Sequence, residues 1–343
     1  MKLRTIILLL CLLTFLSAWA GGYFYYTSLK DAAFKEAERQ VVTRVKLLTR
    51  TLSALLSENI KPVGTLAGIS EVKQFLSRPD GNSYRLVNTI LDHFRATLGA
   101  DVCYLMEVEG TTVASSNRNA PDSFVGQNFS FRPYFRQAIR GEAATYLALG
   151  KTSGKRGAYF SHPVYVHGRQ NPAGIVVLKV SIDLIEKELV THNDEIVLVA
   201  DPKGVIFISN RQELRFKSLW HMLPKEISEL EASLQFGRGP WSWAGLEFTD
   251  RYAKDTSGNE YLMGQAALEN YAGWRVVHLR NLNVISKSVS QTLIRKTGPL
   301  ILTLCLLIGL AVFFLYQRAT HEIDQRKSAE KVLRQSEERY RFI

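Results

Sequence analysis

Two long stretches of the chain contain no charged residue and are dense in leucine, isoleucine, valine and phenylalanine. They cover residues 5–26 and 298–316. A helix needs about 20 apolar residues to cross the hydrocarbon core of a membrane. A core helix of a globular protein with this length would normally show a polar face. The pattern therefore predicts two transmembrane helices, one near each end of the chain.

The first stretch also has the features of a cleaved signal peptide. Lys2 and Arg4 form a short basic segment before it, and Ala18-Trp19-Ala20 fits a small-residue cleavage site. However, the apolar stretch continues through residues 21–26, whose aromatic cluster is typical of a membrane interface. We therefore expect an uncleaved anchor. Both alternatives place the following segment outside the cytoplasm.

Short flanking charges predict how the chain crosses the membrane. Basic residues precede the first span, within residues 1–4, and are numerous after the second span, within residues 317–343. Positive charge is enriched on the cytoplasmic side of membrane proteins. We therefore expect both termini in the cytoplasm of a bacterial cell and residues 27–296 on the periplasmic or extracellular side of the inner membrane.

Residues 27–69 have the pattern of one long helix. Apolar residues repeat within it at alternating steps of four and three, which makes a heptad seam. The seam consists of Val41, Val45, Leu48, Leu52 and Leu55. It can pair with a second copy of the chain in a homodimer or pack on its own domain, and the sequence leaves both alternatives open.

Between this helix and the second span, helical segments alternate with short apolar runs that are typical of strands. The strand candidates are 102–106, 111–115, 158–161, 174–180, 196–200, 205–208, 261–265 and 274–279. Strands followed by a helix and further strands, occurring twice, predict an α+β fold with two PAS-like lobes. We place a membrane-distal lobe at 70–190 and a smaller membrane-proximal lobe at 191–296.

The segment after the second span is charged and contains neither glycine nor proline up to Arg341. We expect it to continue the membrane helix into the cytoplasm as a signalling helix. Residues 336–343 look like the opening of a further domain, of the PAS type. The chain is therefore expected to lack most of its output module.

Composition excludes several classes of function. The net charge of +11 is spread along the chain instead of forming a basic face, and an exported domain would not meet DNA. Cys103 is the one cysteine in the exported region, so no internal disulfide is possible there. His162 and His167 do not have the spacing of metal ligands, and no nucleophile–base pair is visible. We expect no metal, no cofactor and no catalytic domain within residues 1–343.

The richest set of hydrogen-bond donors lies between Ser130 and Lys179. This stretch combines Arg132 and Lys179 with hydroxyl side chains and glycine-rich turns, and Glu142 is its one acidic residue. Arginine binds a carboxylate through a planar fork, lysine acts as a point charge, and hydroxyls add further donors. Two separated cations suit a ligand with two carboxylates. The alternative is that Arg132 and Lys179 cap a sheet edge or pair with Asp183.

Several motifs in this region resemble a known family. RPYF, ALGKTSGKRGAYFSHPV and GIVVLKVSID, together with the later VLVADPKGVIFISN, are similar to the periplasmic region of the four-carbon dicarboxylate transport sensor kinases of the DctB type. The resemblance covers about residues 30–316. It implies a double Cache sensor with twin PAS-like lobes, whose distal lobe binds a dicarboxylate such as succinate, fumarate or malate. Carried over by motif, the ligand contacts are Ser130, Arg132, Tyr134, Thr152, Ser153, Tyr159, Ser161 and Lys179.

The same resemblance implies that the full-length protein is a two-component sensor histidine kinase with a cognate response regulator. Residues 336–343 depart from the family, which usually passes from the membrane to the kinase through a coiled coil. For this reason two other outputs stay open for the same sensor, a diguanylate cyclase and a chemoreceptor. A membrane-tethered solute-binding protein is the alternative from another class.

Overall fold

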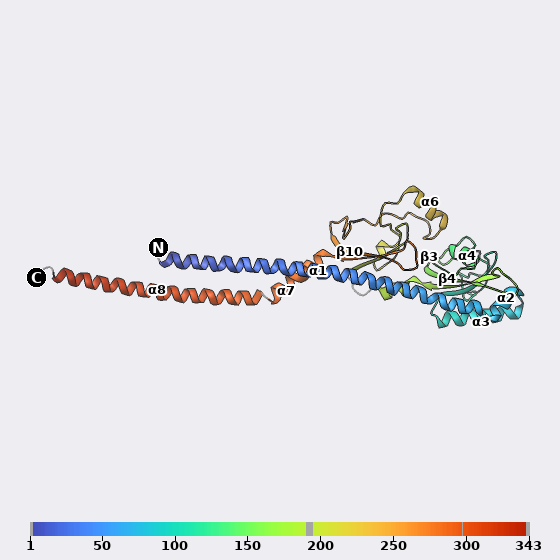
Figure 1. The fold of residues 1–343 in the computed structure, drawn as a ribbon, viewed down its shortest axis with the longest axis horizontal. Helices are drawn as coiled ribbons and strands as arrows, with labels where there is room; N and C mark the ends of the chain where they lie inside the picture. The colour runs from blue at the N-terminus through green and yellow to red at the C-terminus, as the bar shows by residue number, and fades with distance from the viewer. Residues whose placement is uncertain (1–2, 190–194, 297, 341–343) are drawn as a thin grey trace. The chain divides into compact units, whose positions relative to one another are not determined.

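The computed structural model describes residues 3–189, 195–296 and 298–340. The chain forms two compact units, one of residues 39–282 and one of residues 1–38 with 283–343. The helices are α1 (Leu3–Gly68), α2 (Ser70–Ser77), α3 (Gly81–Thr97), α4 (Pro133–Ala138), α5 (Ile182–Leu189), α6 (Pro224–Ser233), α7 (Leu282–Lys296) and α8 (Gly298–Tyr340), with a short 3-10 turn at Gln212–Leu214. The strands of residues 39–282 form two separate sheets, which are drawn in Figure 1.

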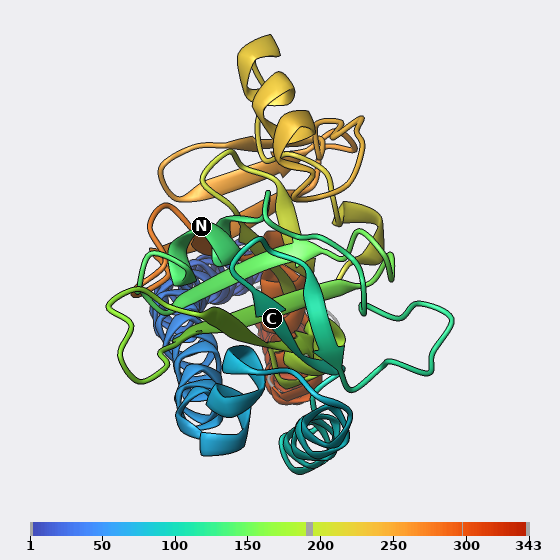
Figure 2. The same ribbon diagram turned by 90° about the vertical axis from the view of Figure 1, so that its right-hand side faces the viewer.

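The first sheet has the order β2-β1-β5-β4-β3 and is antiparallel throughout. Its strands are β1 (Val102–Glu107), β2 (Thr112–Ser115), β3 (Ala144–Leu149), β4 (Arg156–Val164) and β5 (Gly174–Ser181). Side chains alternate between its two faces. Cys103 and Leu105 of β1 join the core with α1, α2 and α3, while Tyr104 and Met106 join a second core with α4. Figure 2 shows α1 and α3 on one face of this sheet and α4 on the other. We call this sheet with α2, α3 and α4 the first lobe.

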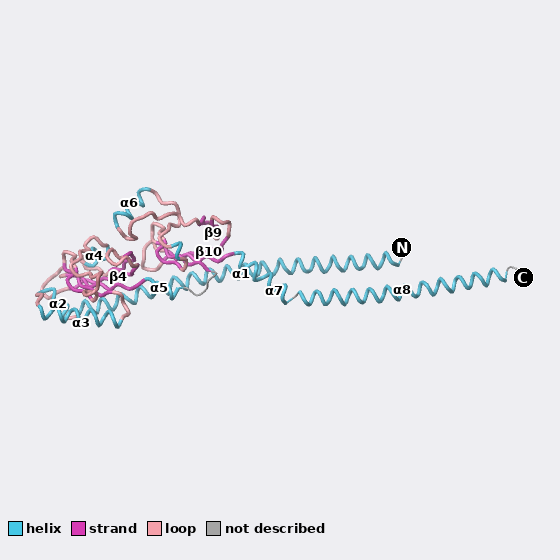
Figure 3. Tube along the Cα trace, turned by 180° about the vertical axis from the view of Figure 1, so that it is seen from behind, coloured by secondary structure: helices cyan, strands magenta, loops and turns pink. Residues whose placement is uncertain are grey.

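The second sheet repeats the arrangement with an added strand, in the order β7-β6-β11-β10-β9-β8. Its strands are β6 (Glu195–Ala200), β7 (Ile206–Ser209), β8 (Leu246–Phe248), β9 (Tyr252–Asp255), β10 (Glu260–Ala267) and β11 (Arg275–Asn281). Val197, Val199 and Val276 pack in the same core as residues 45–67 of α1. In Figure 3 the strands accordingly form two groups along this helix. We call this sheet with α6 the second lobe, and α5 connects the two lobes.

The predicted α+β class, with a long N-terminal helix and two sheets, is confirmed. The structure adds three strands, β3, β8 and β9, and helix α6, which the apolar pattern did not reveal. The predicted lobe limits at 70–190 and 191–296 stay a prediction, and their boundary lies next to residues 190–194, outside the described part of the chain. The predicted output domain at 336–343 also lies partly outside it.

The heptad seam of α1 packs inside its own chain. Val41, Val45, Leu48 and Leu52 are 0–3% exposed and face the two sheets, and Leu55 is half-buried. Of the two alternatives for this seam, packing on its own domain is the one that the structure supports. A homodimer would have to use another surface, and homodimerisation itself stays a prediction.

One of the two predicted transmembrane helices is supported by the structure. Within the described residues, one helical segment, Ile301–Ser336 of α8, is long and apolar enough to cross a membrane. It contains most of the predicted second span. The predicted first span, at 5–26, forms part of α1, but several of its side chains lie outside the described set. A two-pass topology therefore stays a prediction.

Candidate functional site

The site predicted from the motifs lies on the face of the first sheet that α4 covers. Arg132 is the N-cap residue of α4, in an extended conformation, and Pro133 occupies the first helical position. Proline suits this position because its fixed φ fits the helix and its missing N–H would be unpaired there anyway. The short helix places Tyr134 against β3 and β4. The local sequence Arg-Pro-Tyr thus starts α4 and places Tyr134 on the face of the sheet that this helix covers.

The strand register brings the remaining residues into rows. Tyr146 of β3, Tyr159 of β4 and Lys179 of β5 are successive partners across the sheet, so their side chains share one face. Tyr134 stacks on Tyr159 with ring centroids 5.3 Å apart, and its hydroxyl lies 2.8 Å from that of Tyr104. Four tyrosines, from β1, α4, β3 and β4, therefore lie on the same side of the sheet as Lys179.

Lys179 is almost completely buried, with 1% of its surface exposed. Its Nζ donates to Ser153 Oγ at 3.0 Å and lies 3.7 Å from a carboxylate oxygen of Asp101. Burial lowers the pKa of Lys179, and the Asp101 carboxylate partly opposes that effect. A buried ammonium is costly unless it is paired and hydrogen-bonded. Asp101 and Ser153 therefore stabilise a cation that points into the site.

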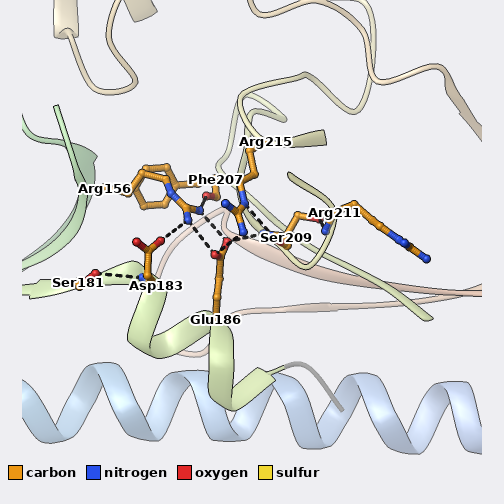
Figure 4. Close-up of polar contacts among 8 residues, drawn as sticks. All are labelled: Arg156, Ser181, Asp183, Glu186, Phe207, Ser209, Arg211 and Arg215. Atoms are coloured by element: carbon orange, nitrogen blue, oxygen red, sulfur yellow. Dashed lines mark hydrogen bonds and ion pairs between the residues drawn. The ribbon is translucent and has the colours of Figure 1, made fainter. Parts of the chain in front are cut away.

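Asp183, the acidic partner considered for Arg132 or Lys179, pairs with Arg156 instead, at 2.6 Å. Figure 4 shows this contact within a larger group of ion pairs that also contains Glu186 and Arg215. Arg156 stands in the motif ALGKTSGKRGAYFSHPV, but the sequence alone did not predict it as the partner of Asp183. It starts β4 and points to the opposite face of the sheet from Tyr159, which follows from the alternation of side chains along a strand.

Arg132 is 3% exposed and is held by backbone oxygens. Its guanidinium donates to the carbonyl of Leu149 at 2.9 Å and to that of Leu234 at 3.2 Å, and it lies 5.1 Å from the ring centroid of Phe131. Within the described part of the chain, no carboxylate accepts a hydrogen bond from Arg132. A buried cation with only neutral partners can gain strongly from an anionic ligand.

The tyrosine hydroxyls remain protonated donors at neutral pH. Burial raises the pKa of Tyr104, Tyr134 and Tyr159 well above the usual value, and raises that of Tyr146 to about 12. The positive charge of Arg132 acts in the opposite direction on all four. Neutral phenols beside two cations are suited to donating hydrogen bonds to a carboxylate.

Two glycines of the motif make room for this arrangement. A Cβ at Gly157 would lie 2.7 Å from Cε of Lys179, and one at Gly150 would lie 3.0 Å from the hydroxyl of Tyr159 and closer still to Oγ of Ser153. Any larger residue would collide with these side chains. Glycine-rich turns are expected to offer backbone N–H donors, whereas in the structure Gly150 and Gly157 provide space.

The predicted contact residues do not all come together. Tyr134, Ser153, Tyr159 and Lys179 are linked through the contacts above, and the charge of Arg132 acts on Tyr134 and Tyr159. The other three are Ser161, Ser130 and Thr152. The hydroxyl of Ser161 is buried on the same face but donates to backbone carbonyls of residues 134 and 144. Ser130 lies against the turn at Gly110, and its carbonyl accepts from Arg136. Thr152 lies in the turn beside Ser153, half-buried.

Three residues of the site were missed from the sequence. Tyr104 and Tyr146 lie in apolar strands, where an aromatic residue looks like ordinary core, although the alternation along β1 places Tyr104 on the same face as Lys179. Asp101 precedes β1 and reaches Lys179 because β1 and β5 are neighbours in the sheet. Asp101 and Lys179 are far apart in the sequence, so no local pattern predicts their ion pair. Within the described residues, no group of His, Cys, Asp and Glu side chains could hold a metal ion.

The fold is shared with sensor domains of bacterial membrane receptors. The sensor domain of the V. cholerae histidine kinase DctB matches it with a TM-score of 0.67 and 23% identity, over 72% of this chain and 98% of that one. The ligand-binding domain of the Campylobacter jejuni chemoreceptor Tlp3, solved in complex with 4-methylisoleucine, matches with a TM-score of 0.52 and 15% identity, over 75% and 94% of the two chains. No protein-family model matches the chain.

Sequence comparison finds relatives among the C4-dicarboxylate transport sensor proteins. The C4-dicarboxylate transport sensor protein DctB of Pseudomonas aeruginosa is 38% identical over 172 residues, which cover 50% of this chain and 28% of that protein. The predicted resemblance to the sensor region of DctB-type proteins is therefore confirmed. The chain spans much less than the full length of this relative.

Proposed function

We propose that this chain is the sensing and membrane-anchoring part of a receptor for a small dicarboxylate. The first lobe binds the ligand outside the cytoplasm, and α8 leads to an output beyond the chain. That output is a histidine kinase, the class that the name of the V. cholerae protein gives for that relative. On this proposal the kinase signals to a response regulator. The same fold in a chemoreceptor has a lower TM-score, so a chemoreceptor output is not better supported.

The observation that carries this proposal is the pair of buried cations on one face of the first sheet. Arg132 is held by carbonyl oxygens, and Lys179 has Ser153 and Asp101 beside it. A dianion in such a site needs both carboxylates paired and hydrogen-bonded. Arg132 would hold one carboxylate and Lys179 the other, with the hydroxyls of Tyr134, Tyr159 and Ser153 as further donors.

Calorimetry tests the site directly. Arg132→Ala and Lys179→Ala should each weaken succinate or malate binding more than tenfold, because a desolvated carboxylate without its partner costs about 2–5 kcal/mol. Lys203→Ala removes a cation of the second lobe that pairs with Glu229 at the surface, and should leave the affinity unchanged. If both site variants bind normally, the ligand lies elsewhere. Binding of a neutral amino acid or an amine in place of dicarboxylates would refute the ligand assignment.

Fusions to alkaline phosphatase test the membrane placement, because this enzyme folds only outside the cytoplasm, where its disulfides form. A fusion at Gly168, in the loop before β5, should be active, and a fusion at Gln325, in α8, should be inactive. Equal expression of the two fusions by immunoblot is the control. The reverse pattern of activity would refute the proposed topology and with it the receptor function.

A further inference from the structure

The turn between β3 and β4, residues 150–155, carries part of the proposed ligand site. Ser153 lies in this turn and accepts a hydrogen bond from Lys179. The turn is closed by its own backbone, with Gly150 N–H donating to the carbonyl of Lys155 and Gly154 N–H donating to that of Gly150. Both ends of the turn are held by residues that lie outside the first sheet.

At the β3 end, the second lobe pairs directly with the strand. Gln235 follows α6; its carbonyl accepts from the amide of Leu149 at 2.8 Å, and its Nε2 donates to the carbonyl of Leu147 at 3.0 Å. The preceding residue, Leu234, has a positive φ of 52° and offers its carbonyl to Arg132. The segment after α6 therefore fixes the end of β3 and one of the two proposed ligand cations together.

At the β4 end, Arg156 is anchored through α5 to the second lobe. Its guanidinium makes two hydrogen bonds to Glu186 of α5, at 2.6 and 2.8 Å, and a third to the carbonyl of Phe207 in β7. Glu186 also accepts from the amide of Ser209 at 3.0 Å and from Arg215 at 2.7 Å. Figure 4 shows Glu186 between the two arginines. Arg156 and Glu186 are both more than nine-tenths buried, so water screens this network only weakly.

This anchor lies one residue from the ligand site. Gly157 follows Arg156 in β4, and its backbone lies close to the side chain of Lys179: a Cβ there would lie 2.7 Å from Lys179 Cε. A displacement of Arg156 would therefore also move the backbone beside Lys179. Burial lowers the pKa of Arg156, but hydrogen bonds and charge from Glu186 and Asp183 more than offset it, so the pKa is raised and the guanidinium stays charged throughout the physiological range.

From these contacts we infer that Glu186 and Gln235 are positioning residues for the ligand site. They hold the two ends of the turn that carries Ser153, and through Leu149 and Gly157 they set the positions of Arg132 and Lys179. Because Gln235 belongs to the segment that follows α6 of the second lobe, and Glu186 also binds Ser209 and Arg215 there, ligand affinity and the arrangement of the second lobe are coupled, and coupling of this kind is reciprocal. The inference extends the proposed function and depends on it only for the ligand.

The experiment uses the full chain in lipid nanodiscs with Glu186→Gln and Gln235→Leu, which loosen opposite ends of the turn. Asp92→Asn is the matched control, because it breaks another two-bond arginine–carboxylate pair of the first lobe, with Arg118, that does not involve the turn. Without ligand, hydrogen exchange at residues 150–155 should become faster in both positioning variants and stay unchanged in the control. Succinate affinity should fall on the order of tenfold in both variants and remain at the wild-type value in the control.

A third measurement distinguishes coupling from a loss of stability. In the wild type, saturating succinate should slow exchange at Ser209 in the second lobe, since this amide donates to Glu186. Glu186→Gln should abolish that slowing even when the site is saturated. Folded variants with wild-type affinity, or with an undisturbed turn, would overturn the inference. If the wild type binds no dicarboxylate, the proposed function fails, and exchange in the turn alone then decides whether Glu186 and Gln235 position it.

Discussion

The two lobes have the same architecture and differ in the side chains on one face of each sheet. In both, one face packs on α1 through aliphatic residues. The opposite face of the first lobe carries a buried lysine, a buried arginine and several tyrosines. The buried core on the corresponding face of the second lobe is aliphatic apart from one tyrosine and consists of Leu198, Ala200, Ile206, Leu219, Leu246, Ala253, Tyr261, Met263, Val277 and Leu279.

This difference separates the requirements of the fold from those of the site. An antiparallel sheet on α1 needs apolar side chains at every second position, and both lobes meet that requirement. Burying Lys179 and Arg132 does not help folding, because an ion pair or polar network in a core is seldom better than a well-packed apolar one. The charged face of the first lobe is therefore consistent with the proposed ligand site, and the second lobe shows how a similar sheet packs with an apolar core on that face.

The largest expected effect tests the second lobe as a packing unit. Leu279 is fully buried in β11, so Leu279→Ala should lower the free energy of unfolding by about 2–5 kcal/mol through a cavity. Tryptophan fluorescence during denaturation measures it, because Trp220, Trp241, Trp243 and Trp274 lie in the second lobe. Under conditions where the protein stays folded, succinate affinity should change by less than about twofold.

Leu279→Met, which nearly conserves volume, is the control for this variant and should cost less than about 1.5 kcal/mol. A large loss of affinity in folded Leu279→Ala would contradict the comparison, because it would mean that this face also takes part in binding.

The second prediction is that Asp201 makes the stability of the second lobe depend on pH. Burial raises the pKa of Asp201, in the turn after β6, from 3.8 to about 6, against the opposing effect of the amides of Val205 and Lys203. The native state then binds more protons than the unfolded state between about pH 4 and 6, so this group lowers stability as pH rises through that window. Asp201→Asn keeps an oxygen acceptor for both amides and should remove this dependence, with a gain of up to about 3 kcal/mol at pH 7.

Unfolding measured at pH 4.5 and pH 7 for the wild type and Asp201→Asn checks this prediction. The two proteins should be closest in stability at the lower pH. A wild type whose advantage over the variant grows as pH rises would show that the carboxylate is stabilised in its charged form instead.

The smallest expected effect sharpens the account of the first lobe. Tyr134→Phe keeps the ring stacked on Tyr159 and removes the hydroxyl that lies 2.8 Å from that of Tyr104. The loss of one hydrogen bond should lower stability by about 0.5–1.5 kcal/mol and weaken succinate binding by about tenfold or less. Tyr165→Phe, at an exposed position, is the matched control. If binding is unchanged while stability falls, Tyr134 supports the site without contacting the ligand.

The pattern of apolar residues predicted those strands that are more apolar than the segments on either side of them. Aliphatic runs such as those of β5, β6 and β11 were found because both of their faces are buried, or nearly so. β3, with the sequence Ala-Thr-Tyr-Leu-Ala-Leu, was missed because two of its six residues are alanines, which have weak strand preference. It is a strand because it pairs with β4, which is a tertiary contact.

The candidate site divides in the same way. The sequence by itself determined that hydrogen-bond donors, with Arg132 and Lys179 among them, gather between residues 130 and 179, because composition and motif order are properties of the chain. It also determined which glycines stand there. Only the tertiary structure decided that those glycines provide space for Lys179 and Tyr159, and that the seam of α1 faces its own sheets.

Tertiary structure also decided the partners of Lys179 and Asp183. Lys179 lies beside Asp101, and Asp183 pairs with Arg156, although the sequence offered Asp183 as a nearer acid for Lys179. The physical reason is the sheet register, which brings together residues that are far apart in sequence and sends neighbouring residues to opposite faces. An ion pair depends on the distance between two atoms in space, and sequence separation does not specify that distance.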